Sequence, residues 1–210
     1  EAVHNMIKKL FINHRRIIFN GNGYSDEWVR EAKRRGLSNL PSMVDAIPAL
    51  VYDSSVKLFE EFEVFTRKEL ESRVEIEYEA YSKAINIEAK AMIDIAGKSI
   101  IPAVIRYTTR LADSIIKLKK AMEGIEPYAQ CSILSEVNDH LKESKLALEN
   151  LKKYMDDVSL ITDVIEHARY MHEVIVPAME ALRKPIDTLE MIVDKDLWPM
   201  PSYGDLLFEV

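Results

Sequence analysis

Glycine, proline and cysteine are all scarce in this chain, which contains six, eight and one of them among 210 residues. Because glycine and proline mark most turns, their scarcity predicts few, long elements and hence a mostly helical protein. The single cysteine, Cys131, excludes an intrachain disulfide and fits a reducing cytoplasm. We expect it to be a free, buried thiol and not a nucleophile.

Long apolar runs are missing as well. Only seven residues separate the charges Lys98 and Arg106, whereas a membrane-spanning helix needs about 20 apolar residues. No secretory signal is present, so the sequence predicts a soluble, cytoplasmic protein with no membrane partner. The chain opens at Glu1 inside a helical pattern, and we expect it to be a fragment of something longer.

Acidic residues are in excess but unevenly placed. The net charge is −7, yet residues 1–36 hold eight Lys or Arg and four Asp or Glu, while the remainder holds 20 and 31. An acidic chain matches nucleic acid poorly, because that binding depends on neutralising phosphates. We therefore expect no nucleic-acid partner, and we expect the basic first segment to face an acidic surface, such as one on the parent protein.

Apolar residues recur every three or four positions through residues 66–122, which indicates one very long helix. At ~1.5 Å per residue it would span roughly 85 Å, so it needs partner helices to cover its apolar stripe. Thr66 and Glu69 have the spacing of a capping box at its start, and Pro102 is expected to kink or restart it. The stripe comprises Leu70, Val74, Tyr78, Tyr81, Ile85, Ala89, Met92, Ala96, Ile100, Val104, Tyr107, Leu111, Ile115, Leu118 and Met122.

The same spacing predicts two further long helices, at residues 134–155 and 159–194, the second kinked at Pro177. We therefore predict an all-α protein, an antiparallel bundle of long, proline-kinked helices preceded by a smaller helical segment. The expected parts are a helical segment at residues 1–36, a proline-containing ordered linker and short helix at residues 37–65, and the bundle with a docked C-terminal tail at residues 66–210.

The stretch from Asn20 to Gly23 is the one place where glycines are dense. Asn and Gly tolerate positive φ, so a tight turn is predicted, followed by a helix that begins at Ser25 and ends at Gly36. A glycine loop before a helix can also hold phosphate. This loop lacks the Gly-x-Gly-x-x-Gly pattern, and Asp26 would repel an anion. A structural turn is the favoured interpretation, and a ligand contact stays the alternative.

No constellation of residues points to catalysis or metal binding. His167 and His172 are five apart, so they do not form the i, i+4 pair of a zinc helix. A carboxylate-bridged di-metal bundle needs Glu-x-x-His on two helices, and this chain has only Glu1 to His4. We predict no catalytic, cofactor-binding or metal-binding residue here. His14 and His140 are scattered along the chain, and solvation or helix dipoles explain the acidic pairs Glu60-Glu61 and Asp156-Asp157.

Two stretches are more distinctive than periodicity. One is residues 14–28 (HRRIIFNGNGYSDEW) followed by residues 40–50 (LPSMVDAIPAL), and the other is residues 198–208 (WPMPSYGDLLF). In this order they resemble the C-terminal region of type III glutamine synthetases, the long bacterial form, and the resemblance covers essentially the whole chain. The shorter runs NIEA (86–89), IPAVI (101–105) and VPAME (176–180) match that region too.

The resemblance implies a parent enzyme that makes glutamine from glutamate, ammonia and ATP, with Mg²⁺ or Mn²⁺, in a large cytoplasmic homo-oligomer. Its metal, ATP and phosphate-binding motifs lie upstream, so no catalytic residue carries over to this chain. Residues 1–36 would be the end of the catalytic domain, and the helical remainder would pack against the rest of the synthetase and neighbouring subunits. The fragment itself is then expected to be structural and not an enzyme.

Two alternatives remain open from the sequence. The chain could be a free-standing helical interaction module that shares only the bundle. It could also be a regulatory module that binds a small ligand or a partner in the bundle.

Overall fold

The structure is a computed structural model that describes residues 1–208, and these residues contain helices and no strand. The prediction of an all-α protein is therefore confirmed. Two compact units are present, Glu1–Ala46 and Ile47–Val210. The boundary between them falls inside the linker predicted at residues 37–65. No helix of the described part is long and apolar enough to cross a membrane.

The first unit holds α1 (Ala2–Asn13), the 3₁₀ turn η1 (Arg15–Ile17), α2 (Asp26–Arg34) and α3 (Met43–Ala46). The Ser25 hydroxyl caps α2 by accepting from the amide of Trp28, as predicted. At the other end Gly36 has a φ of +73°. The Leu37 amide donates to the Ala32 carbonyl at 2.9 Å, which closes α2 with the glycine stop that the sequence predicts.

The second unit begins with short elements, η2 (Ile47–Val51) and α4 (Asp53–Glu61), and continues in α5 (Arg67–Ile95). The predicted capping box is confirmed: the Glu69 carboxylate accepts from the Thr66 amide at 2.7 Å, and the Thr66 hydroxyl accepts from the Glu69 amide. Apolar side chains of the predicted linker are buried, among them Ile47 and Val56.

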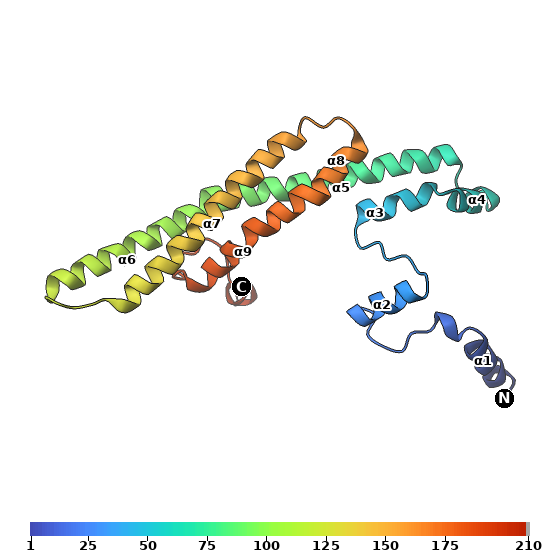
Figure 1. The fold of residues 1–210 in the computed structure, drawn as a ribbon, viewed down its shortest axis with the longest axis horizontal. Coiled ribbons are helices and arrows are strands. Elements are labelled where there is room, and N and C mark those ends of the chain that lie inside the picture. Colours follow the sequence, from blue (N-terminus) through green and yellow to red (C-terminus); the bar gives the residue numbers. More distant parts are fainter. Residues whose placement is uncertain (209–210) are drawn as a thin grey trace. The chain divides into compact units, whose positions relative to one another are not determined.

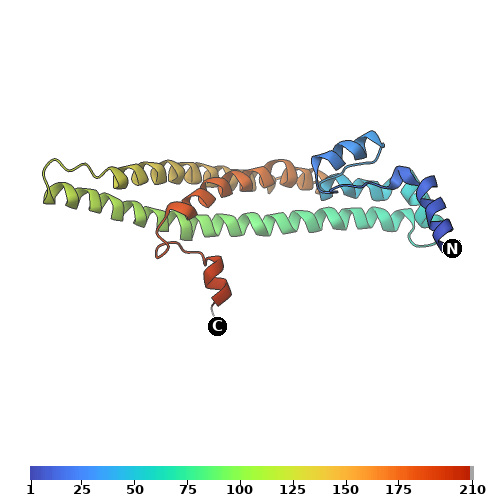
Figure 2. The same ribbon diagram turned by 90° about the horizontal axis from the view of Figure 1, so that it is seen from below.

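The chain remains helical past Pro102. A π-helical turn, η3 (Ala96–Ile100), joins α5 to α6 (Ile101–Ala121), and Figure 2 shows the two helices as one rod. The same arrangement recurs in α8 (Val164–Tyr170), η4 (Met171–Ile175) and α9 (Val176–Ile192). In each case the π turn ends two residues before the proline. In an α-helix the proline ring clashes with the carbonyl four residues earlier. The wider π turn changes which carbonyl lies at that position. A kink at each proline stays a prediction.

Two predicted helix starts are wrong. The helix expected at residues 134–155 is α7 (Tyr128–Val158), which starts directly after Pro127. The last long helix begins at Val164 and not at residue 159. The Asp163 side chain accepts from the amides of Ile165 and Glu166 at 3.0 and 2.8 Å, so Asp163 is the true cap.

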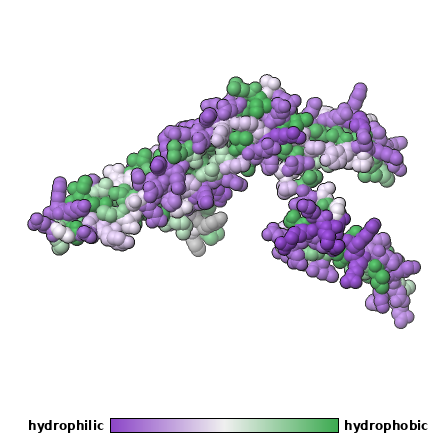
Figure 3. Space-filling model, viewed as in Figure 1, coloured by the Kyte–Doolittle hydropathy of each residue, from purple (hydrophilic) through white to green (hydrophobic). Residues whose placement is uncertain are grey.

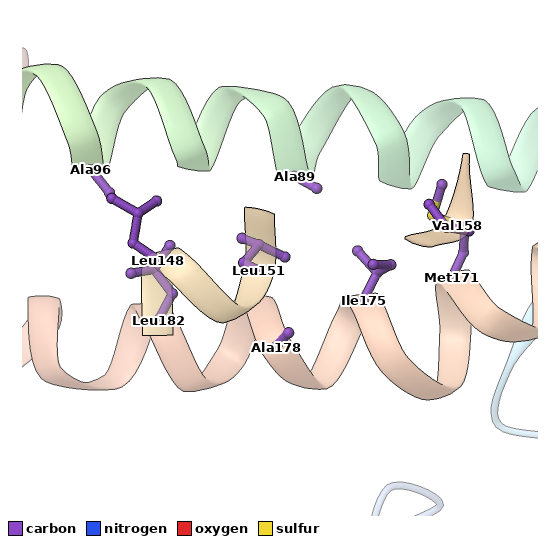
Figure 4. Packing of buried hydrophobic residues seen from close by; sticks show 9 residues of the cluster. All are labelled: Ala89, Ala96, Leu148, Leu151, Val158, Met171, Ile175, Ala178 and Leu182. Atoms are coloured by element: carbon purple, nitrogen blue, oxygen red, sulfur yellow. The ribbon is translucent and has the colours of Figure 1, made fainter. Parts of the chain in front are cut away.

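In Figure 1, α5 and α6 run from right to left, α7 returns beside α6, and α8 and α9 run back along α7. Figure 4 shows the core where α5, α7 and α9 meet, with Leu148 and Leu151 of α7 between Ala89 and Ala96 of α5 and the apolar face of α9. A second cluster lies farther along the bundle around Val104, Val137 and Leu189. Leu197 and Trp198 pack on it, and the short helix α10 (Tyr203–Phe208) follows.

Candidate functional site

The residues with catalytic or metal-binding chemistry are dispersed. His172 Nδ1 lies 3.3 Å from the Tyr81 hydroxyl, and His140 Nδ1 lies 3.0 Å from a Glu143 carboxylate oxygen. Within residues 1–208 no group of three or more His, Cys, Asp or Glu side chains is placed to hold a metal ion. His4 and His14 are exposed in the first unit, and His167 is half-buried on α8.

The acidic pairs and the cysteine have ordinary surroundings. Glu60 accepts from the Arg67 amide at 3.2 Å and so helps to cap α5. Both Asp156 and Asp157 are exposed at the end of α7. Cys131 is free but exposed, so the expectation of a buried thiol is wrong. It lies in the first turn of α7, a turn that the predicted start of this helix omits.

The turn from Asn20 to Gly23 is built by a side chain and not by positive φ. The Asn22 carboxamide oxygen accepts from the Tyr24 amide at 3.0 Å, and the Asn22 carbonyl accepts from the Ser25 hydroxyl at 2.7 Å. Neither glycine has positive φ. Gly21 lies against the Phe19 ring, and a Cβ there would come within 2.6 Å of it, so the ring would have to move. The amide oxygen and the Phe19 ring account for this turn without a ligand.

Aromatic and charged side chains hold the rest of the first unit together. The rings of Phe19 and Trp28 have centroids 4.8 Å apart, and the Arg35 guanidinium lies 6.0 Å from the Trp28 ring. Arg35 also donates to the carbonyls of Arg16 and Ile18, at 2.7 and 3.1 Å. These contacts join the segment before the turn to the end of α2.

Glu31 is the anionic partner in this network. Its carboxylate accepts from Arg34 at two atoms and from Arg35, each at 2.6 Å. The hydrogen bonds from Arg34, and then those from Arg35, lower the pKa of the Glu31 carboxyl to about 2. A hollow beside the network is lined by Arg15, Arg16, Ile17, Arg34, Arg35 and Leu37.

One face of α1 is apolar and buries nothing. No residue of this helix is buried, although its spacing gives it an apolar stripe. Figure 3 shows hydrophobic surface, coloured green, on α1. An amphipathic helix gains its stability mainly by packing such a face, so an uncovered face indicates a contact with another protein surface. The stripe consists of Val3, Met6, Ile7, Leu10 and Phe11, which are between 47% and 65% exposed.

This exposed face, with the arginine-lined hollow of the same unit, is the candidate functional site. The sequence indicated that residues 1–36 are helical and that they carry an excess of basic charge. It did not indicate that no part of this unit would cover the apolar face.

Comparison with known proteins gives the family context. Residues 2–119, more than half of the chain, match the family described as "Glutamine synthetase C-terminal domain". A glutamine synthetase of Butyrivibrio fibrisolvens is 33% identical over the whole chain and 30% of its own length. A type-3 glutamine synthetase of Dictyostelium discoideum is 35% identical over 99% of the chain and 29% of its own length. The chain thus spans about 30% of the length of these relatives.

Proposed function

The chain belongs to the glutamine synthetase C-terminal domain family, and on that premise we propose that it is a non-catalytic structural domain of a type III glutamine synthetase. The parent enzyme would join ammonia to glutamate at the expense of ATP, in the cytoplasm and as a homo-oligomer. The domain would pack against the upstream part of its own polypeptide and support assembly of the oligomer.

The observation that carries this proposal is the uncovered apolar face of α1. The relatives continue well beyond the region that this chain matches, so the parent polypeptide supplies an obvious surface to cover it. Arg15 and Arg16 lie in η1, one residue after the end of α1, and make no ion pair among residues 1–208. An acidic patch next to an apolar one on the upstream domain would complement both features.

The divalent metal ions of the parent family do not fit the described residues. Such ions bind to clustered carboxylate or carbonyl oxygens, and the part of the chain that the structure describes brings no such cluster together. The glycine turn has its Asn22 oxygens already bonded. We therefore assign no step of the reaction to this chain.

The first test is an activity assay of the 210-residue chain alone. We expect a folded, helical protein by circular dichroism that forms no glutamine from glutamate, ammonia and ATP. ATP-dependent glutamine formation by the purified chain would refute the structural role.

The second test concerns α1 in the intact parent synthetase. Leu10→Lys places a charge in the apolar face, whereas Asn5→Lys places the same charge on the polar face of the same helix. We expect Leu10→Lys to shift the oligomer toward smaller species in analytical ultracentrifugation, and Asn5→Lys to leave it unchanged. Equal behaviour of the two variants would show that the face does not take part in assembly.

A further inference from the structure

A groove in the second unit is lined by residues of that unit alone and includes no residue of α1. It has a volume of about 730 Å³ and is formed by α5, the end of α7, the connection between α7 and α8, and α8 itself. This size is typical of pockets that hold small molecules. Its floor includes Val158 and Met171, which form one end of the core in Figure 4. In Figure 3, apolar surface reaches the exterior over the α7–α8 connection, at the top of the view.

Cationic side chains on two different helices line this groove. Lys90 projects from α5 and Lys152 from α7, and neither makes an ion pair within the described residues. The third lysine, Lys83, is already paired with Glu79 at 2.7 Å. Asp156 is the remaining acid of the lining, so two unpaired ammonium groups face one free carboxylate. The balance favours an anion.

A buried hydroxyl at the groove has no partner. Ser82 is only 7% exposed, and its Oγ makes no hydrogen bond within the described residues. The other buried serine of the bundle, Ser144, donates to the carbonyl of His140 at 2.8 Å. Leaving a buried hydroxyl unbonded is unfavourable. A polar atom of a bound molecule would give Ser82 the bond that its own helix does not.

We propose that this groove binds a small organic anion, one that carries a carboxylate or phosphate ester group on a short apolar portion. Lys90 from α5 and Lys152 from α7 hold the acidic group, and Ser82 and Asn86 offer hydrogen bonds beside it. The apolar portion lies against the hydrophobic side of the lining. That side consists of Ile93, Met155, Val158, Ile161, Val164 and Met171.

The test uses four probes and ¹⁵N-labelled 210-residue chain. Sodium hexanoate and hexyl phosphate carry both required features, 1-hexanol lacks the charge, and inorganic phosphate lacks the apolar portion. We expect at least one of the first two to shift the amide resonances of Asn86 and Thr162 saturably. Either single-feature probe should bind about tenfold more weakly or worse. Which of the two amphipathic anions binds tighter separates carboxylate from phosphate ester recognition.

Variants test the lysines directly. Lys90→Gln and Lys152→Gln should each weaken binding about threefold to fivefold, because the contacts are partly exposed to solvent. Lys153→Gln, next in the chain but outside the lining, should have no effect. Binding of 1-hexanol as tight as that of hexanoate, equal binding of inorganic phosphate, no saturable shift with either amphipathic anion, or unchanged affinity in both lysine variants would each overturn the proposal. None of these readouts depends on assembly of the parent enzyme.

Discussion

Ser82 and Ser144 differ in one respect that a stability measurement can detect. Both are buried in long helices, at 7% and 0% exposure, but only Ser144 has a hydrogen-bond partner for its hydroxyl. Replacing either with alanine gains up to about 0.5 kcal/mol in helix propensity. Ser144→Ala also loses a hydrogen bond worth about 1 kcal/mol, so its net effect should be small.

Ser82→Ala loses no bond and instead removes a hydroxyl whose unmet desolvation costs about 1–3 kcal/mol. We expect this variant to be more stable than the parent chain by about 1–2 kcal/mol, or about 2–8 °C in Tm for a chain of this size. Urea unfolding followed by circular dichroism compares the two variants. If Ser82→Ala is less stable than Ser144→Ala, the hydroxyl is satisfied in solution and the reasoning about the groove is wrong.

Three further expectations concern the core, a turn and a titration. Leu182→Ala should lower the free energy of unfolding by about 3 kcal/mol, because Leu182 is fully buried in the core. Met191→Ala, at an 84% exposed position, should change it by less than about 0.5 kcal/mol in the same urea experiment. Gly36→Ala should destabilise the first unit by about 1 kcal/mol, because φ is +73° there. A Cβ added in Gly23→Ala meets no atom within 4 Å, so this variant should have unchanged stability. Thermal melts followed by tryptophan fluorescence compare the two variants. The Glu31 carboxyl should titrate with a pKa of about 2 by NMR, below its ordinary 4.5. Since the pKa is lowered by folding, the stabilisation is complete above about pH 4.5 and is lost as the pH falls toward 2; a pKa of 4.5 in the folded chain would contradict the arginine network.

Local signals in the sequence predicted local structure well. The caps at Ser25 and Thr66 and the stop at Gly36 depend on a few adjacent residues, and each is present. The predicted start of α8 is wrong although the sequence contains a signal for the true one. Asp163 precedes Glu166 by three residues, which is the spacing of a capping pattern.

Features that join distant segments were not predictable in the same way. The groove is formed by α5, the end of α7 and the connection between α7 and α8. The predicted helix start at residue 159 would make that connection part of a helix. Whether the Ser82 hydroxyl has a hydrogen-bond partner depends on how the neighbouring side chains pack. Apolar periodicity in the sequence does not indicate that packing. The exposure of Cys131 likewise follows from where α7 lies against α6, and the sequence indicates only that both are helices.

The repeated π turn has a mechanical consequence for the bundle. The residue before each proline still donates its backbone amide across the π turn. The Ile101 amide donates to the Ala96 carbonyl, and the Val176 amide donates to the Met171 carbonyl. A flexible joint at these points would require breaking those bonds as well as the core contacts of Ile100 and Ile175. The α5–α6 rod and the α8–α9 rod should therefore move as levers, so that a displacement at one end of either rod is carried to the other.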